Sequence, residues 1–201
     1  MISIKSPEDL AIMRIAGQIL AQILIKVQAA IRDGITTGEL DKIAASYMAA
    51  AKVESAFYGY RGYPGNICIS IDDQVVHGIP GSRMMHEGEI VSLDMGIKYR
   101  DFFADAAMTV GIGAVRPEAK KLIDITEQSL AAGIKQMKAG NRLTDISHAV
   151  QQCAEPHGYG VVRQFVGHGI GRQLHEEPEI PNFGKAGQGP LLRQGMVFAI
   201  E

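Results

Sequence analysis

The sequence predicts an α/β protein in which amphipathic helices accompany antiparallel strands. Apolar residues recur every three or four positions between Leu10 and Ile31, which places them on one face of a helix. The stretch Glu89–Val110 contains two segments rich in β-branched and apolar residues around a short polar interruption, as in a β-hairpin. The order helix, helix, strands is expected twice along the chain, so both kinds of element contribute to one fold.

A faint internal repeat predicts two similar halves. Gly34-Ile35-Thr36 and Gly140-Asn141-Arg142 each precede a set of apolar helical positions, at a constant offset of 106 residues. Two similar halves favour a functional site at their junction. The chain has no proline- or serine-rich linker, so we expect one integrated domain over residues 1–201, with pseudo-symmetric halves at roughly 1–112 and 113–201.

The composition is that of an ordinary globular protein, with 46% hydrophobic and 21% charged residues. A net charge of −2 gives no global reason to expect nucleic acid or an anionic membrane as a partner. Cys68 and Cys153 are far apart and form no CxxC motif, which indicates a reducing compartment. Arg14 and Lys26 interrupt the apolar first helix, and no cleavage pattern follows it. We therefore expect a cytoplasmic, unprocessed protein. We also expect a monomer.

Capping residues mark the helices of the first half. Ser6 and Pro7 suit the N-cap and the first helical position, where the missing proline N–H costs little. Thr36, followed three residues later by Glu39, resembles a capping box. The expected elements are helices from Pro7 to about Asp33 and from Thr36 to about Lys52, short strands at Ile67–Ile71 and Gln74–His77, and the hairpin.

Proline and glycine mark the helices of the second half. Pro117 again suits the first helical position, and Gly140 stops the helix that it opens. The expected elements are helices from Pro117 to about Lys138 and from Thr144 to Glu155, a strand with turns within Gly158–Ile170, a loop over Gly171–Leu192, and a final strand from Gln194.

The predicted hairpin carries two aspartates, Asp94 and Asp105. With a turn centred on Tyr99 and Arg100, these aspartates are predicted to lie directly opposite each other, with Cβ atoms about 5 Å apart. Two like charges in such positions destabilise a sheet unless a cation lies between them or one carboxyl is protonated. On the hairpin alone, two solvated aspartates explain the pattern equally well.

A second group of chemically capable residues lies in Gly167–Pro178. His168 stands between two glycines, which allow close approach of another backbone, and His175 follows in the same glycine-rich stretch. Glu201 follows the apolar run Met196–Ile200, where a buried carboxylate requires a cation or hydrogen bonds. Two aspartates, one histidine and one glutamate suit Mn, Fe, Co or Zn ions, which can activate water for hydrolysis.

Two further features have two interpretations each. His77 closes the apolar segment Val75–Val76 just before a turn, where it can point into a cleft or be a satisfied core histidine. The loop YGYRGYP carries Tyr58, Tyr60 and Tyr63, which can line an apolar pocket or pack against the sheet.

Five segments together resemble type I methionine aminopeptidases, the bacterial form. They are YGYRGYPGNICISI, VVHGIP, SLDMGIKYRDFFADAAMTV, FVGHGIGRQLHEEPEIPNFG and GMVFAIE, which follow the family order over essentially the whole chain. The resemblance implies a pita-bread fold, with two pseudo-symmetric helix-helix-strand halves around an antiparallel sheet. It also implies removal of the initiator methionine from nascent chains whose second residue is small. A prolidase or aminopeptidase P activity, or a non-catalytic binding protein on the same scaffold, are the alternatives.

The resemblance implies two divalent metal ions, Co, Mn, Fe or Zn, as cofactors. By similarity, Asp94 binds one ion, Asp105 bridges both, and His168 and Glu201 bind the other. The family continues beyond this glutamate and supplies a second bridging glutamate further on. We therefore expect the chain to be a partial record of a longer protein with one bridging ligand absent, and its activity in this form is left open.

The resemblance also implies a set of residues that contact the peptide substrate. His77 is expected near the backbone nitrogen of the substrate, and His175 at the scissile carbonyl. Glu201 is expected to move a proton from the attacking water to the leaving amine. The residues expected around the methionine pocket are Tyr60, Tyr63 and Cys68. Phe57 and Leu174 depart from the common residues of the family, so an altered pocket shape is expected. The expected partners are nascent peptide N-termini, with transient association with the ribosome.

Overall fold

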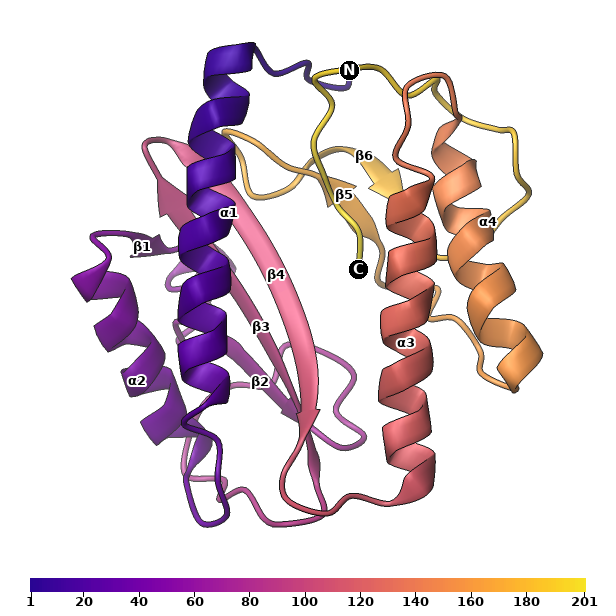
Figure 1. Ribbon diagram of the computed structural model, residues 1–201. Coiled ribbons are helices and arrows are strands. Elements are labelled where there is room, and N and C mark those ends of the chain that lie inside the picture. Colours follow the sequence, from indigo (N-terminus) through magenta and orange to yellow (C-terminus); the bar gives the residue numbers. More distant parts are fainter. The chain divides into compact units, whose positions relative to one another are not determined.

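The computed structural model describes residues 1–201 as two compact units. The first unit is Ala11–Lys120, and the second unit combines Met1–Leu10 with Lys121–Glu201. Both are built from helices and strands, labelled in Figure 1. Every strand pair is antiparallel, so the predicted mixed class is confirmed.

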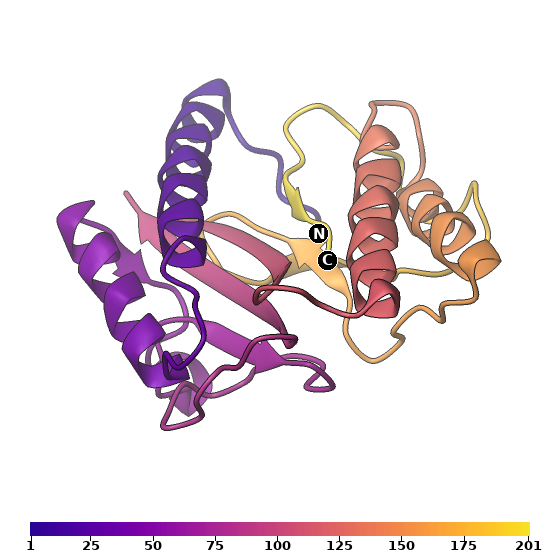
Figure 2. The ribbon, with the colours of Figure 1, turned by 60° about the horizontal axis from the view of Figure 1, so that its bottom comes forward.

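Helices α1 (Pro7–Gln28) and α2 (Thr37–Ala50) lie on one side of the sheet of the first unit (Figures 1 and 2). The predicted capping box is present, since the Thr36 side chain accepts the N–H of Glu39 and the Glu39 carboxylate accepts the N–H of Thr36. α1 ends before the predicted Asp33, because hydrogen bonds that span three residues tighten its last turn.

α1 is the one helix that is long and apolar enough, by length and composition, to cross a membrane. Its buried stripe includes Leu20, Ile23, Leu24 and Val27, which belong to the hydrophobic core of the first unit. A stripe that packs against a sheet is typical of a core helix in a soluble protein. We therefore describe α1 as a core helix.

The sheet of the first unit is organised around one long strand, β3 (Ile90–Tyr99). One edge of β3 pairs with β2 (Cys68–Ile71) and then with β1 (Glu54–Ser55), and the other edge pairs with β4 (Phe102–Gly111). Alternate residues of β3 are buried in the core: Val91, Leu93, Met95 and Ile97. The remaining residues, among them Asp94, therefore lie on the face opposite this core.

The predicted register of the hairpin is wrong by two residues. Asp94 lies opposite Ala107, and Asp105 lies opposite Gly96, because the turn centres on Arg100 and Asp101. These two residues have φ values of 47° and 66°, as a two-residue hairpin turn of the type I′ requires, although neither is glycine. The two aspartates still share a face, since they are now diagonal neighbours instead of direct ones.

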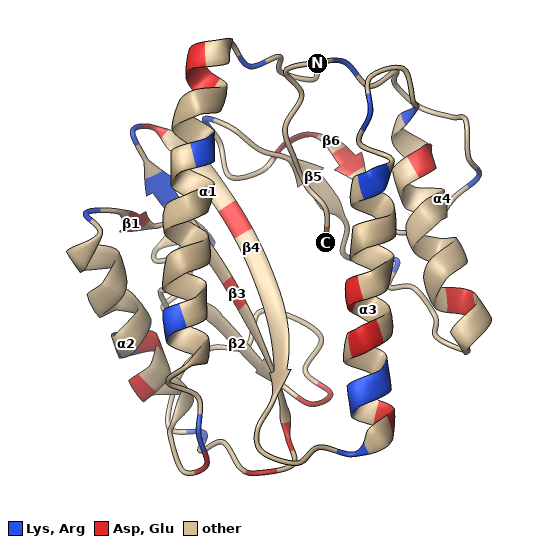
Figure 3. Cartoon of the chain, viewed as in Figure 1, with Lys and Arg blue, Asp and Glu red and all other residues tan.

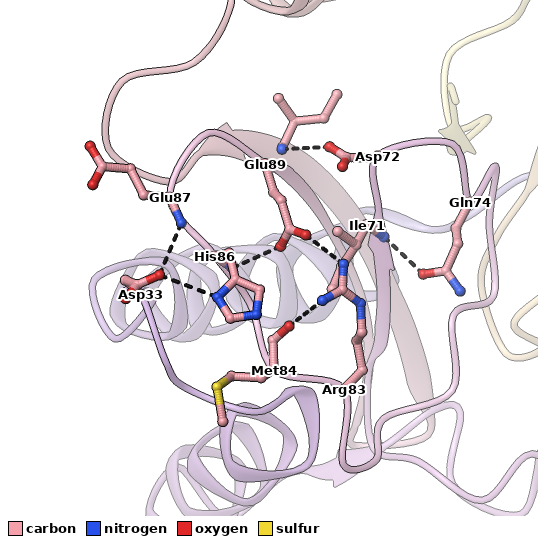
Figure 4. A network of polar contacts seen from close by, with 10 residues as sticks. Asp33, Ile71, Asp72, Gln74, Arg83, Met84, His86, Glu87 and Glu89 are labelled. Carbon is pink, nitrogen blue, oxygen red and sulfur yellow. Dashed lines mark hydrogen bonds and ion pairs between the residues drawn. The ribbon is translucent and has the colours of Figure 1, made fainter.

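The segment between β2 and β3 is a loop, so the strand predicted at Gln74–His77 is wrong. Side chains of this loop accept N–H groups at the ends of the flanking strands: Asp72 accepts the N–H of Ile90 at 3.0 Å, and Gln74 accepts that of Ile71 at 3.0 Å (Figure 4). Glu89 accepts the N–H of His86 at 2.8 Å in the same network. Local hydrogen bonds to polar side chains therefore fix the two ends of this loop.

The second unit contains helices α3 (Pro117–Lys135) and α4 (Leu143–Ala154), of which α3 begins in the first unit. Its sheet has β5 (Gly167–Gly169) at the centre, with β6 (Glu176–Ile180) on one side and β7 (Phe198–Ala199) on the other. A small core joins helix and sheet through these buried residues: Leu143, Ile146, Ile180 and Leu192. The chain also has two 3₁₀ turns, at Tyr60–Gly62 and Glu155–His157.

The prediction of a loop over Gly171–Leu192 is wrong where β6 forms. Pro178 and Ile180 are buried, while Glu177 and Glu179 are exposed, so the segment has the alternation of a strand despite its charges. The strands predicted within Gly158–Ile170 and from Gln194 are confirmed, but both are shorter than predicted.

Candidate active site

The first unit presents two carboxylates on the sheet face opposite its core. Asp94 on β3 and Asp105 on β4 are diagonal neighbours, a position in which the residues lie about 7–8 Å apart. Figure 3 shows acidic positions on both strands. On the same face, Ser92 and Thr109 share a hydrogen bond of 2.8 Å one step further along the hairpin. Two carboxylates at this spacing can reach toward one cation between them.

Gly96 lies directly opposite Asp105 and has no room for a side chain. A Cβ atom there would lie 2.8 Å from Cε1 of Phe57 and 2.9 Å from Cβ of Ala56. The Phe57 ring, which is buried, therefore packs onto the backbone of β3 beside the two carboxylates. Sequence reasoning placed Phe57 in the expected pocket but gave no reason for Gly96.

Cys68 is the cross-strand partner of Asp94 and shares its face of the sheet. Burial raises the pKa of the Cys68 thiol to about 12, with the negative charges of Asp94 and Asp105 adding to the effect and a hydrogen bond between Cys68 and Tyr63 opposing it. The Tyr63 hydroxyl donates to the carbonyl oxygen of Gly78 at 2.8 Å, and burial raises its pKa above the usual range. Both groups are therefore neutral at physiological pH.

We expect Cys68 to resist alkylation in the folded, metal-free protein. With a pKa of about 12, only about 10⁻⁴ of the Cys68 thiols are ionised at pH 8, and the thiolate is the reactive form. Iodoacetamide labelling followed by mass spectrometry should modify the half-buried Cys153 first, and Cys68 only after unfolding in urea. The Cys153→Ser variant supplies the control, and equal labelling rates of the two thiols would contradict the expectation.

His77 lies in the loop beside β2 and is exposed. Its neighbour Gly78 is fixed to the strand, because the Gly78 carbonyl accepts the N–H of Ile69 at 2.9 Å and the Gly78 N–H donates to Oγ of Ser70 at 3.1 Å. His77 itself adopts a φ of 60°, a left-handed conformation that is unusual for histidine. The surrounding hydrogen bonds thus hold an exposed imidazole in a strained backbone position.

The loop that precedes Cys68 is held by Asp41, a residue that sequence reasoning missed. The Asp41 carboxylate accepts the backbone N–H of Asn66 at 2.7 Å and that of Ile67 at 3.0 Å, and it also accepts the Asn66 side-chain amide at 2.9 Å. Tyr60, in the 3₁₀ turn of the same loop, is half-buried with the Arg61 guanidinium 5.4 Å from its ring centre. A lone acid on an amphipathic helix gives no signal of such a role.

In the second unit, His168 lies at the centre of the three-stranded sheet and is buried. Its Nδ1 atom lies 2.8 Å from the carbonyl oxygen of Gly169, which can only accept, so Nδ1 carries the proton. Nε2 faces Oε1 of Glu201 at 3.0 Å. A neutral imidazole Nε2 and a carboxylate are both acceptors, so this geometry requires a proton or a cation shared between them.

The glycines on both sides of His168 are required by their neighbours. A Cβ atom at Gly167 would lie 2.5 Å from the carbonyl oxygen of Ala199 on β7, and one at Gly169 would overlap the carbonyl group of Glu177 on β6. The sequence prediction of a close backbone approach at His168 is confirmed on both sides. The strand order of this sheet thus depends on two residues without side chains.

His175 lies in the turn between β5 and β6, and its imidazole contacts that of His168. The two ring centres are 4.4 Å apart, with an angle of 53° between the ring planes. The side chain of Leu174 next to it is buried, whereas His175 is exposed. The chain reversal therefore brings together two histidines that are seven residues apart in sequence.

The donor atoms of the two units fit divalent metal ions. Carboxylate oxygens and imidazole nitrogen are suitable ligands for Mn, Fe, Co and Zn. A histidine that binds a metal ion through one nitrogen usually donates its other N–H to a carbonyl or carboxylate, as His168 does to Gly169. The tautomer of His168 is thus already the one that leaves Nε2 available as a ligand.

Comparison with known proteins identifies the family. The profile described as metallopeptidase family M24 matches residues 11–201. The chain belongs to metallopeptidase family M24. Among M24 proteins it is 49% identical to a methionine aminopeptidase of Clostridium perfringens, an alignment that covers 100% of this chain and 81% of the relative. It is 44% identical to methionine aminopeptidase 1 of Bacillus subtilis, with the same coverage.

Solved structures of similar proteins confirm the fold. The methionine aminopeptidase of Thermotoga maritima superposes with a TM-score of 0.97 at 40% identity, and that of Rickettsia prowazekii with 0.98 at 34%. Each comparison covers 100% of this chain and 81% of the other. The prolidase of Pyrococcus horikoshii shares the fold at 21% identity, with a TM-score of 0.84 over 98% of this chain. The pita-bread fold and a metallopeptidase of the M24 type are therefore established.

Proposed function

We propose that this M24 enzyme is a metal-dependent aminopeptidase that removes the N-terminal methionine from polypeptides whose second residue is small. The methionine specificity is supported by relatives named methionine aminopeptidases at up to 49% identity. The observation that carries the metal requirement is the pairing of two acceptors, Nε2 of His168 and Oε1 of Glu201, at 3.0 Å. Such a pair is favourable when a cation is bound to both atoms.

We infer that Asp94, Asp105, His168 and Glu201 hold two divalent ions, Co, Mn, Fe or Zn. The spacing of the first two on one sheet face supports this role, as does the tautomer of His168. Bound ions of this kind supply an activated water and polarise a carbonyl group. Glu201 accepts the proton of the attacking water at its carboxylate and passes it to the leaving amine, a role for which its 48% exposed side chain is accessible.

The remaining residues bind and orient the peptide. His175 donates a hydrogen bond to the scissile carbonyl oxygen as that oxygen becomes negative, which stabilises the transition state. His77, exposed at the edge of β2, contacts the backbone nitrogen of the substrate. The methionine side chain is held by Tyr60, Tyr63 and Cys68, of which the last two are neutral and partly or fully buried. Phe57 and Leu174 depart from the common residues of the family, so the shape of this pocket is expected to differ.

In the cell, the substrate of such an enzyme is the N-terminus of a nascent polypeptide. We propose that the protein acts in the cytoplasm as a monomer and associates transiently with the ribosome. An initiator methionine becomes available only after synthesis has begun, so an encounter near the site of synthesis suits this substrate.

The proposed activity is tested with the purified full-length protein, loaded with Mn²⁺ or Co²⁺ after removal of metal by a chelator. We expect the metal-loaded protein to hydrolyse Met-Ala-Ser and the chelated protein to be inactive. We also expect no hydrolysis of X-Pro peptides, in which proline is the second residue and the first residue is not methionine. A preference for such X-Pro peptides would assign a prolidase type of activity. Stoichiometric metal binding without hydrolysis of either peptide would favour the non-catalytic binding protein.

A further inference from the structure

The N-terminal segment of the chain is anchored in the second unit through Lys5. The Lys5 side chain is only 5% exposed, and its Nζ atom lies 2.6 Å from Oε2 of Glu176, the first residue of β6. The backbone N–H of Lys5 donates to the carbonyl oxygen of Gly195 at 2.8 Å. Lysine is rarely buried to this extent unless it is paired, so the ion pair fixes the segment in this place.

Glu176 connects this anchor to the turn that precedes β6. Its Oε1 atom accepts the backbone N–H of Gln173 at 3.2 Å, while Oε2 is occupied by Lys5. Burial by itself raises the pKa of the Glu176 carboxyl, but the hydrogen bonds from Lys5, Gln173 and the Arg172 backbone outweigh burial and hold this pKa below its usual range. The carboxylate is therefore charged, and each of its oxygens has a hydrogen-bond donor.

The backbone of the turn, at Gly171, lies directly against this ion pair. A Cβ atom at Gly171 would lie 2.6 Å from Nζ of Lys5 and 2.6 Å from Oε1 of Glu176. A glycine is thus needed where the turn passes over the two charged groups. Lys5 and Glu176 thus restrict the turn backbone at Gly171, and the position of Glu176 in β6 restricts its other end.

The last residue of this turn before β6 is His175. The centre of its ring lies 4.4 Å from the ring centre of His168. We propose that Lys5 is a positioning residue, which acts through Glu176 to hold the imidazole of His175 where it meets the scissile carbonyl. This inference rests on the proposed function, in which His175 donates a hydrogen bond to that oxygen. Lys5 itself contacts neither the substrate nor a metal ligand in this scheme.

The test uses Lys5→Met, which keeps the length of the side chain and removes its charge. We expect kcat for Met-Ala-Ser to fall about 10- to 100-fold, as a misplacement of about 1 Å at a reacting group does, while KM changes less than threefold. The Mn²⁺ affinity should stay unchanged, and amide hydrogen exchange should rise at residues 172–176. Lys185→Met, which removes an exposed lysine from the same unit, should leave all four quantities unchanged.

A purely structural role of the ion pair predicts a different pattern. Lys5→Met leaves Glu176 charged and partly buried without its partner, whereas Lys5→Met combined with Glu176→Gln leaves no unpaired charge. If the double variant recovers both thermal stability and kcat, or if the single variant keeps kcat within twofold of the parent, Lys5 does not position His175. Recovery of stability without recovery of kcat supports the proposal.

Failure of the proposed function is distinguishable from failure of this inference. If the parent protein hydrolyses no methionyl peptide, the proposed function fails, and the placement of His175 is then judged by the NMR resonances of its imidazole. A shift of these resonances in Lys5→Met, with none in Lys185→Met, supports the placement. Unchanged His175 resonances would overturn it.

Discussion

Asp105→Asn is expected to weaken Mn²⁺ binding by at least about 100-fold, and hydrolysis of Met-Ala-Ser should be lost with it. Removal of a residue that only hydrogen-bonds to a metal ligand typically lowers metal affinity about 10- to 100-fold, so removal of a ligand itself should lower it at least as much. In the metal-free protein, by contrast, Asp105→Asn should stabilise the fold. One of two like charges on the same sheet face is removed, so its thermal midpoint should rise slightly. Calorimetric titration and thermal unfolding, each with and without Mn²⁺, measure the two effects.

Asp101→Asn is the matched control for this variant. Asp101 lies in the turn of the same hairpin, its side chain is 75% exposed, and its nearest cation is Lys98 at 3.3 Å. Asparagine tolerates the left-handed conformation that Asp101 adopts, so the turn should be preserved. The control should bind Mn²⁺ as the parent does. Unchanged affinity in Asp105→Asn would leave the two strand aspartates as ordinary residues of the sheet.

Gly169→Ala is expected to destabilise the second unit by about 3 kcal/mol or more, which is the upper range for forcing atoms into a packed site. The added Cβ would lie 2.7 Å from the carbonyl carbon of Glu177 and still closer to its oxygen. β6 cannot move away without breaking its pairing with β5, on which His168 lies. Urea unfolding measures the loss of stability, and metal titration of the folded fraction measures the displacement of His168.

Gly160→Ala provides the comparison in the same unit. Gly160 is exposed, no atom outside its neighbours lies within 4 Å of a Cβ added there, and its φ is not in the left-handed region. The substitution should change the free energy of unfolding by less than about 1 kcal/mol in either direction. If Gly169→Ala were tolerated as well as Gly160→Ala, the close approach of the strands around His168 would not be needed for stability.

Local signals predicted the helices well, and longer-range features poorly. The capping box of Thr36 and Glu39 depends on side chains three residues apart, so it can be recognised in the sequence and is present in the structure. The hairpin register was wrong because Arg100 and Asp101 adopt positive φ values without glycine or asparagine to indicate them. β6 was missed because its proline and its glutamates are typical of a loop, although its exposed and buried residues alternate.

The chemistry of the site could be predicted further than its geometry. Glycines beside His168 predicted a close backbone approach, and the residue types predicted the class of metal. The ion pair of Lys5 and Glu176 joins residues 171 positions apart, and the support of the Cys68 loop by Asp41 depends on tertiary packing as well. No periodicity or spacing in the sequence carries such contacts, so only a structure could reveal them.

The position of β3 in its sheet determines how the two aspartates can respond to ions of different size. β3 is held on both edges, by β1 and β2 on one side and by β4 on the other, and Asp94 is therefore the stiffer of the two carboxylates. β4 is bonded to the sheet through β3. A change in the backbone distance between the two aspartates therefore comes from bending of β4. Residues of β4 that are remote from Asp105 can therefore tune the distance between the two strand aspartates.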